Sequence, residues 1–161
     1  MAPSSVIQLL NSMSPFFNKS SEVRRANFSP SPRAIQSAKA KASERGSSAE
    51  FLVADALALG SLDRRFRTAL DCGVFHVFDD PERPVYVASL ASVLELGGVL
   101  HLLCFSDRQP GSFGPRRVTK QELRDSFADG WDVSDIVAAT FVTNLPELQA
   151  QAWLATIVRA A

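Results

Sequence analysis

The hydrophobic pattern of this chain is clearest where two apolar runs flank an amphipathic stretch. Residues 66–72 read as a strand, and residues 99–105 are almost continuously apolar, which is typical of a central strand covered on both faces of a parallel sheet. Residues 81–96 between them carry apolar positions at helical spacing, and the Gly-Gly pair at 97–98 is expected to end that helix. The side chains expected to face the sheet are Val85, Ala88, Leu90, Ala91 and Leu94.

The same alternation of helices and strands continues on both sides of this unit. Pro32 begins an Ala/Lys-rich helix that is expected to end at Gly46. Thr119 and Glu122 form the capping pattern of a helix over 119–127. Further elements are predicted as a strand at 50–54, a short helical turn near 61–65 and closing strands at 131–143 and 152–160. The pattern predicts an α/β fold: a Rossmann-like three-layer sandwich with a mostly parallel sheet and a C-terminal antiparallel hairpin.

The first 31 residues lack clean periodicity and contain three prolines. We expect an irregular segment there, with one helical turn at 5–11, and a single domain over residues 32–161. The segment is Ser-rich and acid-poor, which is compatible with an organellar transit peptide or with a non-homologous, poorly ordered terminus.

Composition and charge change this picture little. The chain has 161 residues, 46% of them hydrophobic, and a net charge of zero, so nothing points to nucleic acid or a membrane as a partner. The average hides an asymmetry, because residues 1–48 carry a net charge of +5 and the rest −5. Cys72 and Cys104 are expected to be free thiols of an intracellular, cytoplasmic protein, with an organelle as the alternative.

Candidate chemistry gathers where the predicted strands end. Asp55 follows an apolar run, where its carboxylate would either accept hydrogen bonds from a ligand or cap the next turn. Asp71, Cys72, Gly73 and His76 crowd the turn after the next strand, the place where open α/β sheets bind ligands. His76 is interpreted as a substrate-side base or hydrogen-bond partner, or as a satisfied, half-buried residue without a catalytic role.

Two further features bear on function. The Gly/Pro-rich loop after residue 105 is expected to form a lid over a small molecule, or to be a connection whose Arg116 and Arg117 face solvent. No metal site is expected, since His76 and His101 are the only histidines and no acidic cluster surrounds them. There is also no GxGxxG motif and no phosphate-binding P-loop.

Three motifs in order resemble the class I S-adenosylmethionine-dependent methyltransferases, in particular the thiopurine S-methyltransferase-like branch. They are DCGVFHVF, RPVYVASLASVLELGGVLHLLCFSD and GPRRVTKQELRDSF. The resemblance implies S-adenosylmethionine as cofactor and a small molecule as methyl acceptor, through a sulfur, oxygen or nitrogen nucleophile. It implies Asp55 and Ala56 beside the adenine, His76 facing the transferable methyl, and around the methionine part Asp71, Cys72 and Gly73.

The N-terminal segment departs from that family. The family's acidic, glycine-rich cofactor loop should precede the helix at 33–45, yet no glycine occurs before Gly46. The acidic residue expected to hold the ribose is replaced by Asn27 or Ser29, depending on the alignment. The fold is therefore expected to be N-terminally incomplete, and a non-catalytic remnant or interaction module is the alternative to an enzyme. The sequence identifies neither the methyl acceptor nor the oligomeric state.

Overall fold

The computed structural model describes residues 6–10, 32–47, 49–112, 114–142 and 149–160. Its elements, in chain order, are β1 (Val6–Leu10), α1 (Pro32–Glu44), η1 (Ala56–Leu62), β2 (Phe66–Cys72), η2 (Phe75–Val77), α2 (Glu82–Val93), β3 (Leu94–Phe105), α3 (Lys120–Ser126), β4 (Trp131–Phe141) and β5 (Ala150–Arg159). No helix among these residues is long and apolar enough to cross a bilayer.

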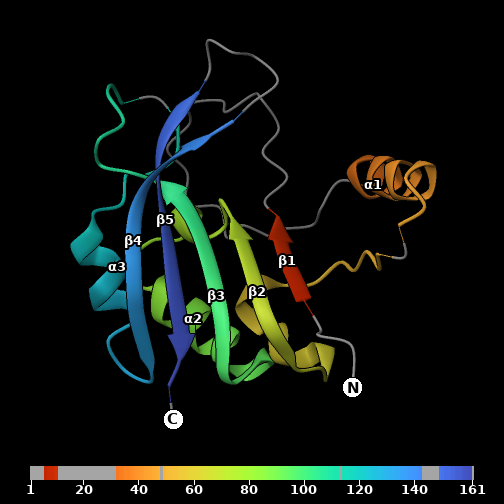
Figure 1. Ribbon diagram of the computed structural model, residues 1–161, viewed down its shortest axis with the longest axis horizontal. Helices are drawn as coiled ribbons and strands as arrows, with labels where there is room; N and C mark the ends of the chain where they lie inside the picture. Colours follow the sequence, from red (N-terminus) through yellow and green to blue (C-terminus); the bar gives the residue numbers. More distant parts are fainter. Residues whose placement is uncertain (1–5, 11–31, 48, 113, 143–148, 161) are drawn as a thin grey trace.

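The five strands form one open sheet in the order β1-β2-β3-β5-β4. The first three strands are parallel, whereas β5 pairs antiparallel with both β3 and β4. The carboxyl ends of β1, β2 and β3 therefore lie at one edge of the sheet, which is the upper edge in Figure 1. This confirms the predicted mixed sheet with its closing antiparallel hairpin.

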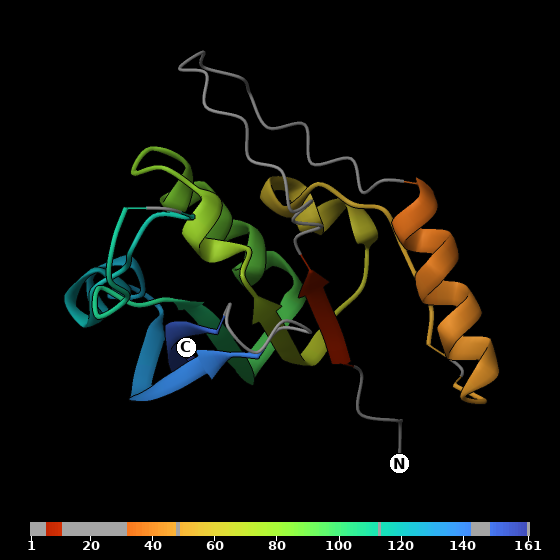
Figure 2. The same cartoon turned by 90° about the horizontal axis from the view of Figure 1, so that it is seen from above.

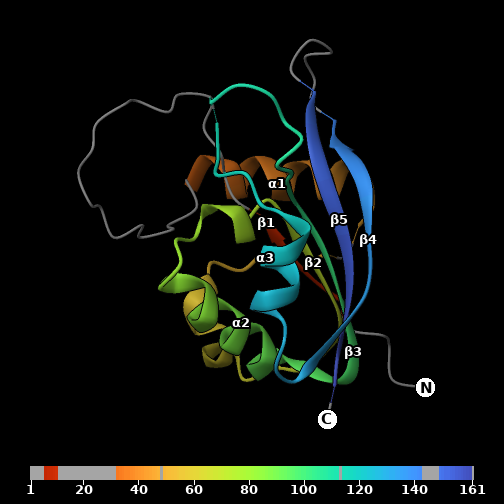
Figure 3. The ribbon, with the colours of Figure 1, turned by 90° about the vertical axis from the view of Figure 1, so that its left-hand side faces the viewer.

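Helices α2 and α3 lie on the same face of the sheet, as Figure 3 shows, and α2 also packs against η1. The side chains of β3 alternate accordingly, with Leu100, Leu102 and Cys104 buried under the helices. His101, Leu103 and Phe105, on the opposite face, are only half-buried. Helix α1 stands beyond the β1 edge of the sheet, at the right of Figure 2. The apolar core is thus concentrated between the sheet and one helical layer.

The helix predicted from Thr119 is confirmed together with its cap. Helix α3 begins after Thr119, whose side chain accepts a hydrogen bond from the Glu122 N–H, while the Glu122 side chain accepts one from the Thr119 N–H. The two strands predicted at 66–72 and 99–105 are also confirmed, as β2 and as the second half of β3. These elements could be predicted from the sequence because a helix cap and a continuous apolar run are each defined by residues close together in the chain.

The expectation of an irregular segment with a helical turn at 5–11 is wrong for Val6–Leu10. These residues form a strand, β1, that pairs in parallel with β2. Ile7 and Leu9 pack against the core, opposite Ala69 and Asp71. A strand of five residues in a Ser-rich context gives a weak local signal, because its hydrogen bonds go to a strand far away in the sequence.

The strand expected at 50–54 is absent, since these residues belong to no ladder. They lead into η1, and the edge of β2 beside which another strand would lie is already paired with β1. An apolar run becomes a strand only where a neighbouring backbone is available for pairing. The strand propensity of residues 50–54 alone was therefore not enough to predict a strand.

Helix α2 is shorter than predicted, and its predicted inward face is confirmed only in part, since Leu90 is fully buried whereas Ala88 is exposed. It ends at Val93, and Gly97, with φ of +74°, forms a turn inside β3 and does not cap the helix. Val85 is 49% exposed, whereas Arg83 and Tyr86 are buried. The Tyr86 hydroxyl donates to Asp71, and Arg83 pairs through Nη1 with Glu122, although its Nε and Nη2 have no hydrogen-bond partner among the described residues.

The turn inside β3 supports a test of local packing. A Cβ at Gly98 would lie 2.8 Å from the Glu95 carbonyl oxygen and 3.1 Å from the Arg67 carbonyl oxygen, so Gly98→Ala forces two backbones apart. We expect it to lower the free energy of unfolding by about 1–3 kcal/mol in urea titrations. The matched variant Gly97→Asn has open space and a side chain that tolerates left-handed backbone, so its loss should be clearly smaller. Equal losses would contradict this packing.

Candidate active site

The candidate site is built on the turn that follows β2. Gly73, the first residue of this turn, has φ of +83°, a backbone conformation that only glycine adopts easily. Its N–H donates to the Leu103 carbonyl oxygen at 3.0 Å, which ties the turn to β3. The turn then continues into η2, so Val74, Phe75 and His76 are all buried at the carboxyl end of the sheet.

Asp71 holds this turn in place. Its carboxylate is 2% exposed and accepts hydrogen bonds from the Val74 N–H at 2.7 Å, the Phe75 N–H at 3.0 Å and the Tyr86 hydroxyl at 2.9 Å. Burial raises the pKa of Asp71 to about 6, although the three hydrogen bonds act to lower it. Both carboxylate oxygens are thus occupied by groups of the chain itself.

His76 belongs to the same turn. One of its ring nitrogens makes a hydrogen bond, and the other has no hydrogen-bond partner among the described residues. Its Nδ1 accepts a hydrogen bond from the Phe105 N–H at 3.0 Å. Its Nε2 is buried and has no hydrogen-bond partner among the described residues. Burial, together with the positive charge of Arg83, lowers the pKa of His76 to about 4, so the imidazole is neutral near pH 7. The expectation of a half-buried histidine is wrong, because His76 is 2% exposed.

Asp55 and Ala56 lie on a separate element. Asp55 is the N-cap of η1, and its Oδ1 accepts a hydrogen bond from the Leu57 N–H at 2.9 Å. The capping role left open by the sequence is therefore present. The Asp55 side chain is exposed, and its Oδ2 has no partner in the described part of the chain, so that oxygen stays available to a ligand. No hydrogen bond or ion pair among the described residues joins Asp55 to the Asp71 turn.

Both cysteines are free, as expected. Cys72 is partly exposed at the end of β2, while Cys104 is buried in β3. Burial, and then the negative charge of Asp71, raise the pKa of both thiols. Because the thiolate is the reactive form, neither cysteine is set up as a nucleophile.

The loop after β3 is held down by its own arginines. The Arg117 guanidinium donates to the carbonyl oxygens of Pro110, Gly111 and Pro115 and lies 5.8 Å from the centre of the Phe105 ring. The interpretation in which Arg116 and Arg117 only face solvent is therefore wrong. The alternative of a lid over a ligand stays a prediction.

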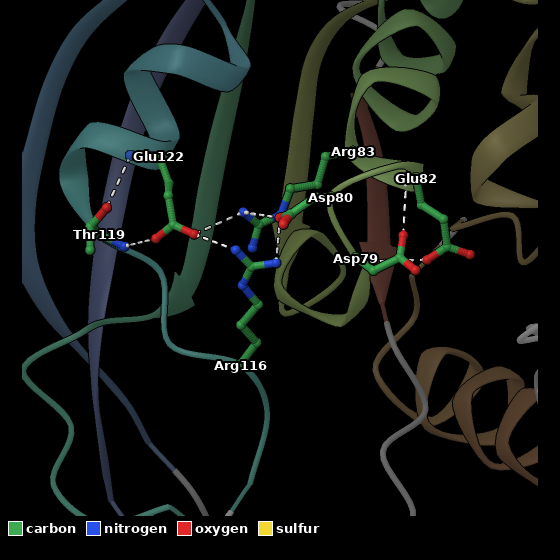
Figure 4. A network of polar contacts seen from close by, with 7 residues as sticks. All are labelled: Asp79, Asp80, Glu82, Arg83, Arg116, Thr119 and Glu122. Carbon is green, nitrogen blue, oxygen red and sulfur yellow. Dashed lines mark hydrogen bonds and ion pairs between the residues drawn. The ribbon is translucent and has the colours of Figure 1, made fainter. Parts of the chain in front are cut away.

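A charged network that the sequence analysis missed joins this loop to α2 and α3, as Figure 4 shows. One oxygen of Glu122 accepts from Arg116 at 2.6 Å and from Arg83 at 3.2 Å, and Arg116 also pairs with Asp80 at 2.5 Å. Burial of Glu122 acts to raise its pKa, but hydrogen bonds from Thr119, Arg116 and Arg83 lower the pKa of Glu122 to about 2. The four charged residues of the network are among those that line a groove of about 710 Å³ between α2 and α3. The network fastens the two helices and the loop together.

This arrangement, with a glycine turn after an inner parallel strand and a closing antiparallel hairpin, defines a Rossmann-like methyltransferase fold. A structure solved in work on the conversion of a disulfide bond into a thioacetal group during echinomycin biosynthesis is similar with a TM-score of 0.68 and 32% identity. The match covers 80% of this chain and 63% of that one. The 1,6-didemethyltoxoflavin-N1-methyltransferase of Burkholderia thailandensis shares the fold at a TM-score of 0.58 and 21% identity, covering 76% of this chain and 56% of that one.

The sequence model of the methyltransferase domain family matches residues 16–98, and the chain belongs to that family. The 2-heptyl-1-hydroxyquinolin-4(1H)-one methyltransferase of Mycobacteroides abscessus is 34% identical over 116 residues, which are 70% of this chain. The chain spans about half the length (51%) of this curated relative. Asn27 and Ser29 fall within the family match but lie outside the described residues.

The burial of neutral His76 has a consequence for stability that can be measured. Its pKa falls from 6.5 to about 4 on folding, so between these values the unfolded chain binds more protons than the folded one. The stability is therefore complete above pH 6.5 and is lost as the pH falls toward 4. The stability of the parent chain relative to His76→Asn should rise by about 3 kcal/mol across this window.

Urea titrations of both proteins at several pH values would check this difference. Asp71 titrates in the same range in the opposite sense, but both proteins carry it, so its effect cancels in the comparison. A difference that does not change with pH would contradict the burial of a neutral imidazole.

Proposed function

We propose that this protein transfers a methyl group from S-adenosylmethionine to a small-molecule nucleophile, and that it belongs to the thiopurine S-methyltransferase-like branch. The observation that carries the proposal is the family match over residues 16–98, because this match contains the whole turn at the carboxyl end of β2. In open α/β sheets, ligands bind beyond the carboxyl ends of the strands, which is where this turn lies.

The described residues are suited to two parts of the cofactor. Asp55, with its unpaired Oδ2, and Ala56 would hold the adenine, since a carboxylate accepts hydrogen bonds from an amine. Cys72 and Gly73 would line the methionine part, because they end β2 at the carboxyl edge of the sheet and the left-handed backbone of Gly73 turns the chain there. Asp71 contributes to the same subsite through the turn it holds, since both its oxygens are already occupied.

The protein would contribute to this reaction mainly by positioning the acceptor relative to the methyl group of the cofactor. S-adenosylmethionine supplies a methyl group bound to a positively charged sulfur. The nucleophile attacks the methyl carbon in line, and the sulfur leaves as the neutral thioether. Such a reaction depends on proximity and orientation more than on an acid–base pair.

His76 is the residue we place on the substrate side. The name of the M. abscessus relative, a hydroxyquinolinone methyltransferase, supports a small, ring-containing acceptor that carries a sulfur, oxygen or nitrogen nucleophile. We propose no nucleic-acid or membrane partner, and a cytoplasmic location.

One observation favours a second candidate, a non-catalytic remnant or interaction module. The stretch where the family's cofactor loop is expected contains no glycine before Gly46 and no acidic residue at Asn27 or Ser29. Losing the carboxylate that holds the ribose removes charge-assisted hydrogen bonds, each contributing about 1.5–3 kcal/mol. Cofactor binding by the chain itself decides between the two candidates.

Calorimetry with S-adenosylhomocysteine is the test of the cofactor site. We expect binding by the parent chain, and an affinity lower by about tenfold or more in Asp55→Ser, because a charge-assisted hydrogen bond is lost. Serine caps a helix as well as aspartate, so the melting temperature should stay close to that of the parent chain. The absence of any binding would reject the enzyme in favour of the remnant, and an unchanged affinity in Asp55→Ser would reject this adenine site.

Methyl transfer itself is followed with radiolabelled cofactor and two acceptors. A thiopurine offers a sulfur nucleophile, and 1-hydroxyquinolin-4(1H)-one offers an oxygen. Transfer to the thiopurine supports the proposed branch, whereas transfer to the hydroxyquinolinone alone would contradict the branch and leave the methyltransferase activity standing.

A further inference from the structure

The hydrogen bonding of His76 determines which of its nitrogens carries the proton. The Phe105 N–H donates to Nδ1, so the lone pair of Nδ1 is used and Nδ1 carries no hydrogen. A neutral imidazole has one protonated nitrogen, which must then be Nε2. His76 therefore presents an N–H donor at Nε2, and neither nitrogen has a free lone pair with which to take a proton from a nucleophile.

This Nε2–H group has no hydrogen-bond partner in the described part of the chain, although His76 is 2% exposed. Leaving a buried donor without a partner costs about 1–3 kcal/mol. The Phe105 N–H fixes the ring through Nδ1, and Nε2 lies beside Gly73, where an added Cβ would come within 3.5 Å of it. An unsatisfied donor fixed in this way is suited to a ligand that supplies the acceptor.

The surroundings of the donor are aromatic. The ring centres of Phe105 and Phe141 lie 5.1 Å and 5.9 Å from that of His76, and 5.3 Å from each other. Both phenylalanines are partly exposed, so this cluster reaches from the buried donor to the surface at the carboxyl ends of the strands. Flat rings pack well against such walls, with edge-to-face or offset contacts.

We propose that His76 donates its Nε2 hydrogen to an acceptor oxygen of a planar aromatic substrate seated against Phe105, and that it does not act as a general base. The inference rests on the proposed methyl transfer and specifies its substrate class. Since Nε2 has no accessible surface, the Phe141 ring has to turn aside for the substrate ring to take its place. The proton of the nucleophile is then lost to water and not to this histidine.

The first test is the tautomer in the free, full-length chain. Two-bond ¹H–¹⁵N spectra distinguish a protonated from an unprotonated ring nitrogen. Between about pH 6 and pH 8 we expect His76 to be neutral with its proton on Nε2 only. A proton on Nδ1, or a charged ring across this range, would overturn the proposal, because Nε2 would then not be the donor of a neutral imidazole.

The second test uses two probes of similar size and needs no cofactor. Chromone is a planar bicycle with a carbonyl oxygen, and naphthalene is a planar bicycle without one. We expect the parent chain to bind chromone about tenfold or more tightly than naphthalene, and chromone alone to shift the Nε2–H resonance. No preference for chromone in the parent chain would overturn the proposal.

Two variants separate the donor from the structural role of His76. Asparagine places its amide oxygen near the position of Nδ1, so His76→Asn keeps an acceptor for the Phe105 N–H and removes the distal donor. It should fold and bind the two probes equally. Glutamine reaches the position of Nε2, so His76→Gln should regain part of the preference for chromone while being less stable. Retention of the full preference in His76→Asn would overturn the proposal.

These outcomes are independent of cofactor binding. A chain that fails to bind S-adenosylhomocysteine but prefers chromone through His76 would reject the proposed function and retain the donor. A chain that binds the cofactor and methylates an acceptor but shows no such preference would retain the function and reject the donor.

Discussion

The buried carboxylate of Asp71 is the interaction on which the end of β2 depends. A charge with 2% exposure is tolerated only if its oxygens are satisfied, and here two backbone N–H groups and the Tyr86 hydroxyl do so. The two backbone bonds set the course of the chain after Gly73, and the Tyr86 bond fastens that course to α2. His76 then faces β3, where the Phe105 N–H fixes its ring. Asp71 thus fixes the backbone that carries His76, and the Phe105 N–H fixes the orientation of its ring.

This arrangement separates residues that contact a ligand from those that place them. In the proposed function, Asp55 and Gly73 would contact the cofactor and His76 the substrate, while Asp71, itself held by the Tyr86 hydroxyl, positions the turn through two backbone N–H groups. Arg83, Arg116 and Glu122 have a comparable structural role, since their ion pairs fasten α2 to α3 and to the loop after β3. A methyl transfer that depends on orientation is consistent with a site whose polar residues serve mostly to hold its shape.

The sequence predicted those features that depend on neighbouring residues. The capping box at Thr119, the strand ending at Cys72 and the helix from Pro32 follow from signals within a few positions. Val6–Leu10 and the run at 50–54 were misassigned because a strand is decided by its distant partner, here β2. Burial of Arg83 and Tyr86 was missed because it depends on Glu122 and Asp71, which only the fold brings near. The motif around Gly73 indicated the site, but the partners of Asp71 and His76 could not be read from spacing.

The most direct measurement of the central claim maps S-adenosylhomocysteine onto the amide spectrum of the full chain. A ligand concentration on the order of 1 mM half-saturates a site with a binding free energy of about −4 kcal/mol. We predict shifts at the amides of Cys72 and Gly73, at the carboxyl end of β2, and, separately, at those of Ala56 and Leu57, which begin η1 beside the proposed adenine site. Shifts confined to the groove between α2 and α3, or none at all, would contradict the placement of the active site at the Asp71 turn.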